Sequence, residues 1–163
     1  MENQICMEDR IQKAVALFKE GYNCSQSVVG AFADLYGFDP KKAMRFAASF
    51  GGGIGRMRMT CGAACGMFTL VGLEKSASDG ADREGKSANY KDVQRLAQQF
   101  KEENGSLICA ELLGLNKDTS ITPNAEARTE SYYKKRPCSM MVETAARLFA
   151  EYYKELHPEV AIQ

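Results

Sequence analysis

Residues 61–75 read CGAACGMFTLVGLEK, and this stretch decides the fold of the chain. Cys61, Cys65 and Phe68 recur at intervals of three and four residues, the spacing of side chains that share one face of an α-helix. The spacing predicts a helix over 61–75 with these three side chains on one side. Its most apolar run, at about 66–73, is far shorter than the ~20 residues that a membrane-spanning helix needs.

The first turns of this helix consist largely of small residues, Gly62, Ala63 and Gly66. Each glycine costs a helix about 1 kcal/mol relative to alanine, so another requirement must favour glycine here. We expect the small residues either to allow close contact with a neighbouring helix or to leave room for a bulky cofactor beside the cysteine sulphurs.

Apolar residues at helical spacing fill most of the remaining chain. They predict further helices that carry these stripes: Ile11, Val15, Phe18 and Tyr22; Val28, Phe32 and Leu35; Met44 and Ala47; Val93, Leu96, Ala97 and Phe100; Met141, Val142, Ala145, Phe149 and Tyr152. A short helix is expected at about 106–113. Asp39-Pro40 is typical of a helix start, whereas Gly21, Gly37 and the Gly51–Gly55 run are placed to end helices.

Two polar segments, Ser76–Gly85 and Asn116–Arg136, are predicted loops, the second with a helical turn or two. No stretch shows the two-residue alternation of a β-strand, and no repeat or linker divides the chain. The sequence therefore predicts an all-α fold, a single compact bundle of about six to seven helices over residues 1–163.

Bulk composition excludes several classes of function. Lys plus Arg and Asp plus Glu both number 21, so the formal net charge is zero, whereas nucleic-acid-binding domains carry an excess of basic residues. We therefore expect no nucleic-acid partner, and we interpret the run Lys134–Arg136 as solvated charge. The first ten residues lack the apolar core of a secretion signal. We expect a cytoplasmic protein that is not embedded in a membrane.

Cysteine is the unusual component of the chain. Six cysteines in 163 residues is high for a cytoplasmic protein, where thiols stay reduced, so metal binding or catalysis explains them better than structural disulphides. The one histidine, His157, precedes Pro158, and we expect it to end a helix at the surface. A single histidine there excludes histidine-based hydrolases and histidine-rich metal sites.

Four of the cysteines each begin a different predicted helix and lie on its apolar stripe: Cys24, Cys61, Cys109 and Cys138. The residues just before them suit a helix start: Asn23, Thr60, Gly105 or Ser106, and Pro137. Because apolar stripes face the core and side chains lean toward the helix N-terminus, we expect the four sulphurs to meet inside the bundle.

The N-terminus of a helix presents unpaired N–H groups and about half a positive charge. This favours the thiolate, which is both the nucleophile and the metal ligand. Four converging thiolates suit an iron–sulphur cluster, and two suit a reactive dithiol pair. The separations of 37, 48 and 29 residues contain no CxxC knuckle of a zinc ribbon and do not match the close-set cysteines of common ferredoxins. Packing of each cysteine as a small buried hydrophobe is the structural alternative.

The Gly51–Gly55 run lacks the lysine and the preceding strand of a phosphate-binding loop. We interpret it as a close approach of backbone near Cys61. Arg56 and Arg58 are expected to be solvated, with stabilisation of a thiolate as the alternative. Cys65 is interpreted as core filler, with a resolving thiol or an extra ligand as the alternative.

The segment Cys61-Gly62-Ala63-Ala64-Cys65-Gly66 fits a CGAxxG motif. With Cys24 before it and Cys109 and Cys138 after it, the chain resembles the C_GCAxxG_C_C family over about residues 8–155. The resemblance implies a small redox-active protein whose four characteristic cysteines are Cys24, Cys61, Cys109 and Cys138, and it gives Cys6 and Cys65 no role. Members of that family lie near transporter and oxidoreductase genes, and related domains occur beside haem-binding segments of electron-transfer proteins. The resemblance therefore implies an oxidoreductase or a transporter as the partner.

Three functions stay open on the sequence. In the first, Cys24, Cys61, Cys109 and Cys138, with Gly62 beside them, bind an iron–sulphur cluster or another metal, and the protein transfers electrons. In the second, no cofactor is bound and a pair of these cysteines cycles between dithiol and disulphide. Either would make the chain an oxidoreductase or an electron carrier. In the third, the chain is a non-enzymatic helical interaction module associated with a transporter.

Overall fold

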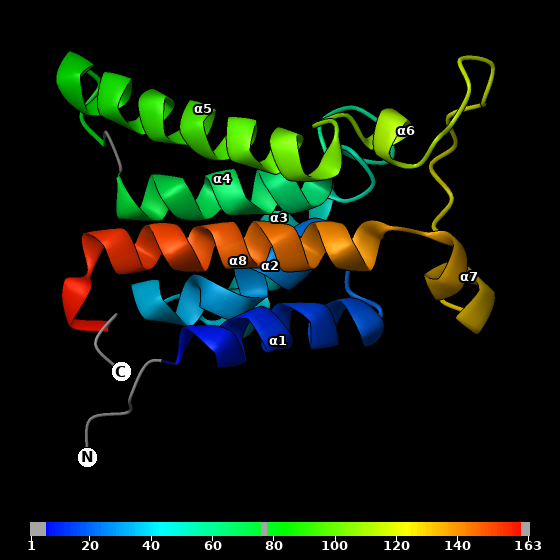
Figure 1. Cartoon of the computed structure of the whole chain (residues 1–163), viewed down its shortest axis with the longest axis horizontal. Helices are drawn as coiled ribbons and strands as arrows, with labels where there is room; N and C mark the ends of the chain where they lie inside the picture. Colours follow the sequence, from blue (N-terminus) through cyan, green and yellow to red (C-terminus); the bar gives the residue numbers. More distant parts are fainter. Residues whose placement is uncertain (1–5, 76–77, 161–163) are drawn as a thin grey trace.

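The computed structural model describes residues 6–75 and 78–160 as a stack of helices (Figure 1). Within these residues the chain forms eight α-helices: α1 (Met7–Lys19), α2 (Cys24–Phe32), α3 (Pro40–Ala47), α4 (Gly62–Glu74), α5 (Arg83–Asn104), α6 (Cys109–Leu112), α7 (Glu130–Lys135) and α8 (Cys138–Leu156). The same residues contain no β-strand, only an isolated bridge between Thr60 and Ile108. The all-α prediction is confirmed. The number of helices exceeds the expected six to seven because the helical turn predicted within 116–136 forms α7.

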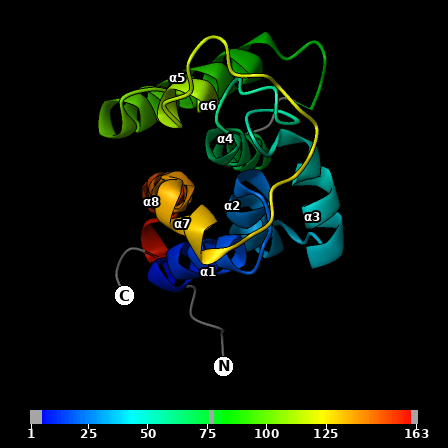
Figure 2. The same ribbon diagram turned by 90° about the vertical axis from the view of Figure 1, so that its right-hand side faces the viewer.

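The long helices run side by side, with α8 packed against α1, α2 and α4. Helix α5 lies over α4 and α8, and α3 packs on the outer side of α2 (Figure 2). Fully buried apolar side chains fill the space between them, among them Phe18, Phe32, Met67 and Phe149. The rings of Phe32 and Phe149 meet edge to face with their centroids 5.0 Å apart, which joins α2 to α8 in the centre of the core.

The starts of α2 and α3 follow their predicted signals. Asn23 caps α2 in a reciprocal capping box with Gln26. At α3 the carboxylate of Asp39 accepts a hydrogen bond from the backbone N–H of Lys42, and Pro40 occupies the first helical position.

Other boundaries differ from the prediction. Helix α1 ends before Gly21, so Tyr22 leaves the predicted stripe and is exposed. Helix α5 extends far beyond its apolar stripe and begins at Arg83, inside the segment predicted as the loop 76–85, because Asp82 caps it there. Residues 76 and 77 of that loop lie outside the described residues.

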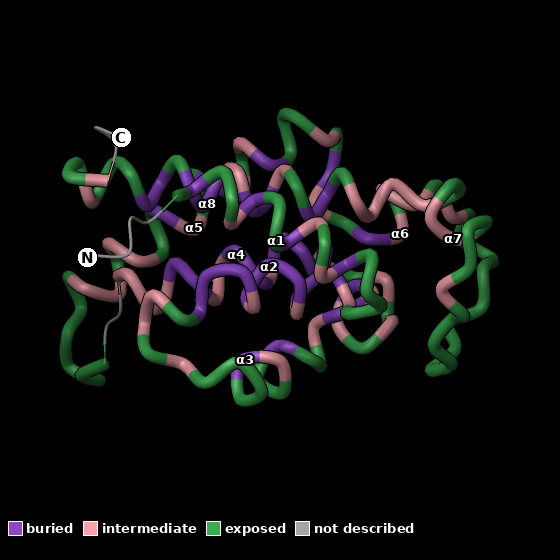
Figure 3. Tube along the Cα trace, turned by 90° about the horizontal axis from the view of Figure 1, so that it is seen from below, coloured by how far each residue is buried: buried purple, intermediate pink, exposed green. Residues whose placement is uncertain are grey.

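Most of the first ten residues of helix α4 are buried, and Figure 3 shows buried residues in purple through the centre of the bundle, where α2 and α4 lie. Ala63, Ala64 and Leu70 are fully buried, whereas Cys65 and Phe68 of the predicted face are only half-buried. The helix predicted over 61–75 is present, one residue shorter at each end, and burial extends beyond the predicted face because α2, α5 and α8 all pack against it. Among the described residues, no helix has both the length and the apolar character needed to cross a membrane.

Two glycines of α4 offer a matched test of its packing. A Cβ atom at Gly66 would lie 3.0 Å from the carbonyl oxygen of Ser25 and 3.1 Å from Cβ of Val28. At Gly72 no atom of the described residues, apart from its chain neighbours and the backbone of its own helix, lies within 4 Å of that position. We expect Gly66→Ala to lower the free energy of unfolding by about 1–3 kcal/mol through overpacking. Gly72→Ala should raise it by up to about 1 kcal/mol through helix propensity. Urea unfolding followed by circular dichroism measures both, and equal effects would contradict the close contact of α2 with α4.

Candidate functional site

The four cysteines at predicted helix starts line one cavity at one end of the bundle. Cys24, Cys61, Cys109 and Cys138 all contribute to its wall, together with Gly62. The cavity measures about 60 Å³, room for a few water molecules. It lies at the end where α4, α6 and α8 begin, the end that faces the viewer in Figure 2. Residues that are up to 114 positions apart in the chain therefore share one small space.

Each cysteine occupies the start of its own helix. Cys24, Cys109 and Cys138 are the first residues of α2, α6 and α8. Cys61 is the residue that caps α4, so the expectation that Thr60 caps this helix is wrong by one residue. Thr60 instead pairs with Ile108 in the isolated bridge.

A short backbone bridge holds the starts of α4 and α6 together. The N–H of Cys61 donates to the carbonyl oxygen of Leu107 at 2.7 Å, and the N–H of Cys109 donates to that of Met59 at 2.6 Å. A single antiparallel bridge is too short to leave an alternating pattern in the sequence, so the sequence analysis did not find it. The bridge fixes Cys61 and Cys109 beside each other although 48 residues separate them.

Glycines allow the backbone to approach the cysteines closely, as the sequence predicted for 51–55. A Cβ atom at Gly53 would lie 2.5 Å from Cβ of Cys109, and Gly53 also has a φ of +74°, which disfavours other residues. The backbone of the glycine-rich segment 51–55 therefore lies close to Cys109 as well as to the start of α4. A Cβ atom at Gly62 would lie 2.5 Å from Sγ of Cys24, so glycine at this position leaves room for that sulphur.

Burial disfavours the thiolate forms of Cys24, Cys61, Cys65 and Cys138. It raises the pKa of Cys24 and Cys61, that of Cys138 to about 12, and that of Cys65 to about 11. Backbone N–H groups of Gly52 lower the pKa of Cys24, and those at the start of α4 lower that of Cys61, but both effects are smaller than that of burial. The expectation that helix N-termini hold the thiols of Cys24, Cys61 and Cys138 as anions is therefore wrong for these thiols without a bound group.

Arginine side chains line the same cavity: Arg58, Arg128 and Arg136. Nη1 of Arg58 lies 3.8 Å from Sγ of Cys109, and Arg136 pairs with Glu126. The expectation that Arg56, Arg58 and Arg136 are solvated is wrong, because all three are half-buried. Lys134 and Lys135 are exposed, as expected.

The remaining candidates lie elsewhere. Cys6 is exposed just before α1, and Cys65 is half-buried on α4 outside the cavity lining, with Sγ 3.9 Å from the carbonyl oxygen of Thr60. His157 follows the last residue of α8 as expected, at the opposite end of that helix from Cys138. Its ring is half-buried and contacts Glu74, with Nε2 and Oε1 2.5 Å apart, so it is not a purely surface residue.

All six cysteines are free thiols. Among the residues that the structure describes, no three side chains of His, Cys, Asp or Glu stand close enough together to hold a single metal ion. What the site offers is four thiols from four helices around one cavity, with three guanidinium groups beside them.

Comparison with known proteins identifies a family. The model of the C_GCAxxG_C_C family, described as "Putative redox-active protein (C_GCAxxG_C_C)", matches residues 22–152. That range contains all four cysteines of the cavity. No curated protein and no solved structure matches the chain.

The raised thiol pKa values predict how stability depends on pH. Above the pKa of an unfolded thiol, about 8.5, the unfolded chain loses thiol protons that the folded protein still holds. The stabilising contribution is complete below that pKa and is lost as pH rises toward the folded values, by up to about 1.4 kcal/mol per pH unit for each thiol.

We therefore expect the free energy of unfolding in urea, measured with a reductant present, to be lower at about pH 9.5 than at about pH 7.5. Cys138→Ala should reduce this difference because it removes one of the buried thiols. Cys6→Ala, at an exposed site, serves as the control. Equal stability of the original protein at the two pH values would contradict the burial of the thiols.

Proposed function

Since the chain belongs to the C_GCAxxG_C_C family of redox-active proteins, we propose that it is an electron-transfer protein in which Cys24, Cys61, Cys109 and Cys138 hold an iron–sulphur cluster. The observation that carries this proposal is the delivery of one thiol from each of four helices into one cavity. A dithiol reaction needs only two thiols, and cysteines that serve only in packing need not share a cavity. The common iron–sulphur clusters, by contrast, are held by four cysteines.

The charges around the cavity fit a group bound by thiolates. Four thiolates in a buried site carry negative charge that burial disfavours, as the raised pKa of Cys61 shows. Arg58, Arg128 and Arg136 supply positive charge in the same wall, and the backbone N–H groups at the start of α4 point at Cys61. These groups would compensate the thiolate charge once iron takes the place of the thiol protons.

A cluster in this position would take up and release single electrons. The chain's own residues have three tasks there. The four cysteines hold the group, and Gly62 leaves the space beside Cys24 free. Apolar side chains such as Leu112 and Met141 line the cavity and keep water away. Arg58, beside Cys109, would raise the reduction potential because positive charge favours the reduced form.

A second candidate function, thiol–disulphide exchange, is favoured by the position of Cys24 beside the start of α4. Cys24 lines the cavity together with Cys61, Cys109 and Cys138, and its Sγ lies against Gly62, the residue that follows Cys61. If Cys24 formed a disulphide with one of these cysteines, the two thiols would give two electrons and two protons to a disulphide of a substrate, which would become two thiols. Protonated buried thiols are poor nucleophiles, so we place this function second.

Either function requires reduced cysteines. We propose the cytoplasm as the location, because thiols stay reduced there. An oxidoreductase or a transporter complex would then be the partner that exchanges electrons with the site.

Iron loading tests the cluster proposal. We expect anaerobic reconstitution with ferrous iron and sulphide to give a brown protein with a broad visible absorption band and bound iron and sulphide. Cys24→Ala, Cys61→Ala, Cys109→Ala and Cys138→Ala should each lose most of this iron, because each removes one ligand.

Cys65→Ala is the matched control, since Cys65 lies on α4 close to Cys61 but outside the cavity lining. It should keep its iron. Circular dichroism of each variant shows whether it folds, so that loss of iron can be separated from loss of structure. If the original protein is well folded but stays free of iron after reconstitution, the cluster proposal is contradicted. Thiol counting by mass spectrometry before and after a mild oxidant then tests the exchange reaction.

A further inference from the structure

We propose that an open polar cleft next to the cysteine cavity binds a small molecule that carries carboxylate or phosphate groups, and that the cleft holds this molecule against the cysteine site. A reaction of this molecule at the cysteines rests on the proposed function. Its binding does not, and binding can be tested whether or not the proposed function holds. The cleft measures about 430 Å³, within the range of about 300–1,000 Å³ that is usual for small-molecule sites.

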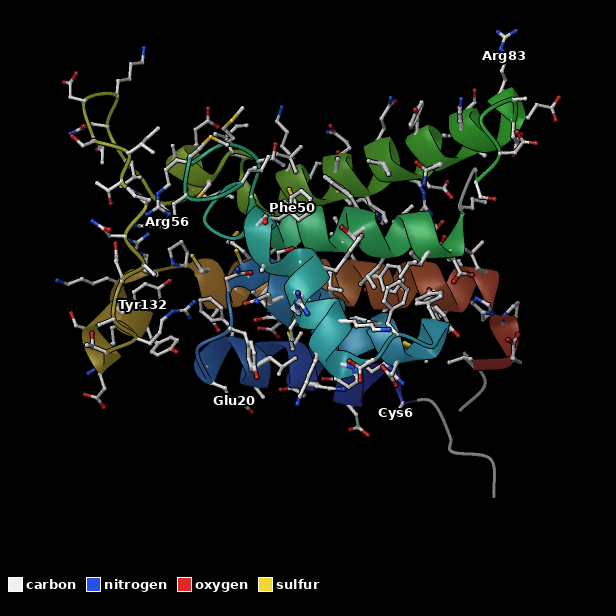
Figure 4. The ribbon with its side chains drawn as sticks, turned by 180° about the vertical axis from the view of Figure 1, so that it is seen from behind. Cys6, Glu20, Phe50, Arg56, Arg83 and Tyr132 are labelled. Atoms are coloured by element: carbon white, nitrogen blue, oxygen red, sulfur yellow. The ribbon has the colours of Figure 1, made fainter. Side chains whose placement is uncertain are left out.

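The cleft and the cysteine cavity have a common wall. Six residues line both: Asn23, Gly52, Arg58, Arg128, Tyr132 and Arg136. The outer side of the cleft is formed by the segment that leads from α6 to α7, which curves around this end of the bundle (Figure 2). In Figure 4 the side chain of Arg56 lies between the 51–60 loop and this segment, with Tyr132 below it. A ligand in the cleft would therefore lie beside the thiols.

The charge of the cleft is strongly one-sided. Arg56, Arg58, Arg128 and Arg136 line it, and Glu126 is the one carboxylate in its lining. Arg56 and Arg136 both pair with Glu126, while Arg58 and Arg128 form no ion pair with any carboxylate of the described residues. A half-buried guanidinium without a counter-ion is costly, and an anionic ligand would supply the missing negative charge.

Arg58 is the side chain best placed to meet such a ligand. Its one side-chain hydrogen bond within the described structure goes to Sγ of Cys109, so most of its five N–H donors have no protein acceptor. Arg128 differs, because its guanidinium donates to the carbonyl oxygens of Phe18 and Tyr22 and stacks on the Phe18 ring. We therefore assign Arg58 to the ligand and Arg128 to the support of the cleft wall.

The backbone of the 51–60 loop is strained in a way that places arginines in the cleft. Ile54, Arg56 and Arg58 have φ values of 63°, 60° and 61°, a left-handed conformation that costs a non-glycine residue about 1–2 kcal/mol. Hydrogen bonds from the N–H of Arg58 to Gly52 and from that of Met59 to Gly53 hold this turn. Strain of this kind persists where the surrounding structure fixes it, and it clusters at ligand sites.

In the same turn, arginine side chains are more buried than the methionine side chains beside them, the reverse of what is usual. Arg56 and Arg58 are half-buried and line the cleft, whereas the alternate residues Met57 and Met59 are 47% and 53% exposed. A loop with no task beyond connection would expose its arginines and bury its methionines. The arrangement is explained if the two guanidinium groups are held inward to bind an anion.

Titration calorimetry on the reduced, iron-free protein tests the proposal with two probes, pyrophosphate for the phosphate group and succinate for the carboxylate group. We expect at least one probe to bind, with an affinity that falls as salt is added. Arg58→Gln should weaken binding about tenfold or more, because it removes a charge-assisted hydrogen bond. Glu126→Gln should strengthen binding, because Glu126 competes for Arg56 and Arg136.

Arg83→Gln is the matched control, since Arg83 is an exposed arginine at the far end of the molecule (Figure 4). It should leave the affinity unchanged. Binding of neither probe, or equal affinity in the original protein and in Arg58→Gln, would overturn the proposal. The measurement needs no iron, so a failure of iron loading and a failure of anion binding are separate results. Which probe binds more tightly identifies the phosphate or the carboxylate as the group that is recognised.

Discussion

The site depends on the pair of backbone hydrogen bonds that joins residues 59–61 to residues 107–109. Helix α6, which carries Cys109, has only 4 residues and could not be held in place by core packing of its own. The bridge attaches it to the start of α4, and Gly53 lets the 51–60 loop close over Cys109 from the other side. The long helices α2, α4 and α8 then set the positions of Cys24, Cys61 and Cys138 through their common core.

Much of the fold could be predicted because local signals decide it. The capping box of Asn23 and the Asp39-Pro40 pair give the starts of α2 and α3, and apolar spacing gives the long helices. The grouping of Cys24, Cys61, Cys109 and Cys138 could be predicted from their places at helix starts. The bridge at Thr60 and the cleft could not, because both depend on loops that meet only in the folded chain.

Two opposing effects meet in the cavity. Helix N-termini and guanidinium groups favour thiolates, while burial favours neutral thiols, and burial prevails for Cys24, Cys61 and Cys138. On the functions proposed above, the buried thiols would exchange their protons for metal ions, whereas the guanidinium groups that face the neighbouring cleft would bind an anion. Sequence reasoning missed this balance because it can weigh a helix dipole but not the depth at which a side chain lies.

The central claim is that the four sulphurs of the cavity act together on one bound group. Anomalous diffraction at the iron edge, from crystals of the anaerobically reconstituted protein, tests it most directly. The account predicts one iron peak, enclosed by Sγ of Cys24, Cys61, Cys109 and Cys138. Iron bound elsewhere, at Cys6 or Cys65 for example, or four sulphurs that point away from any common centre, would contradict it.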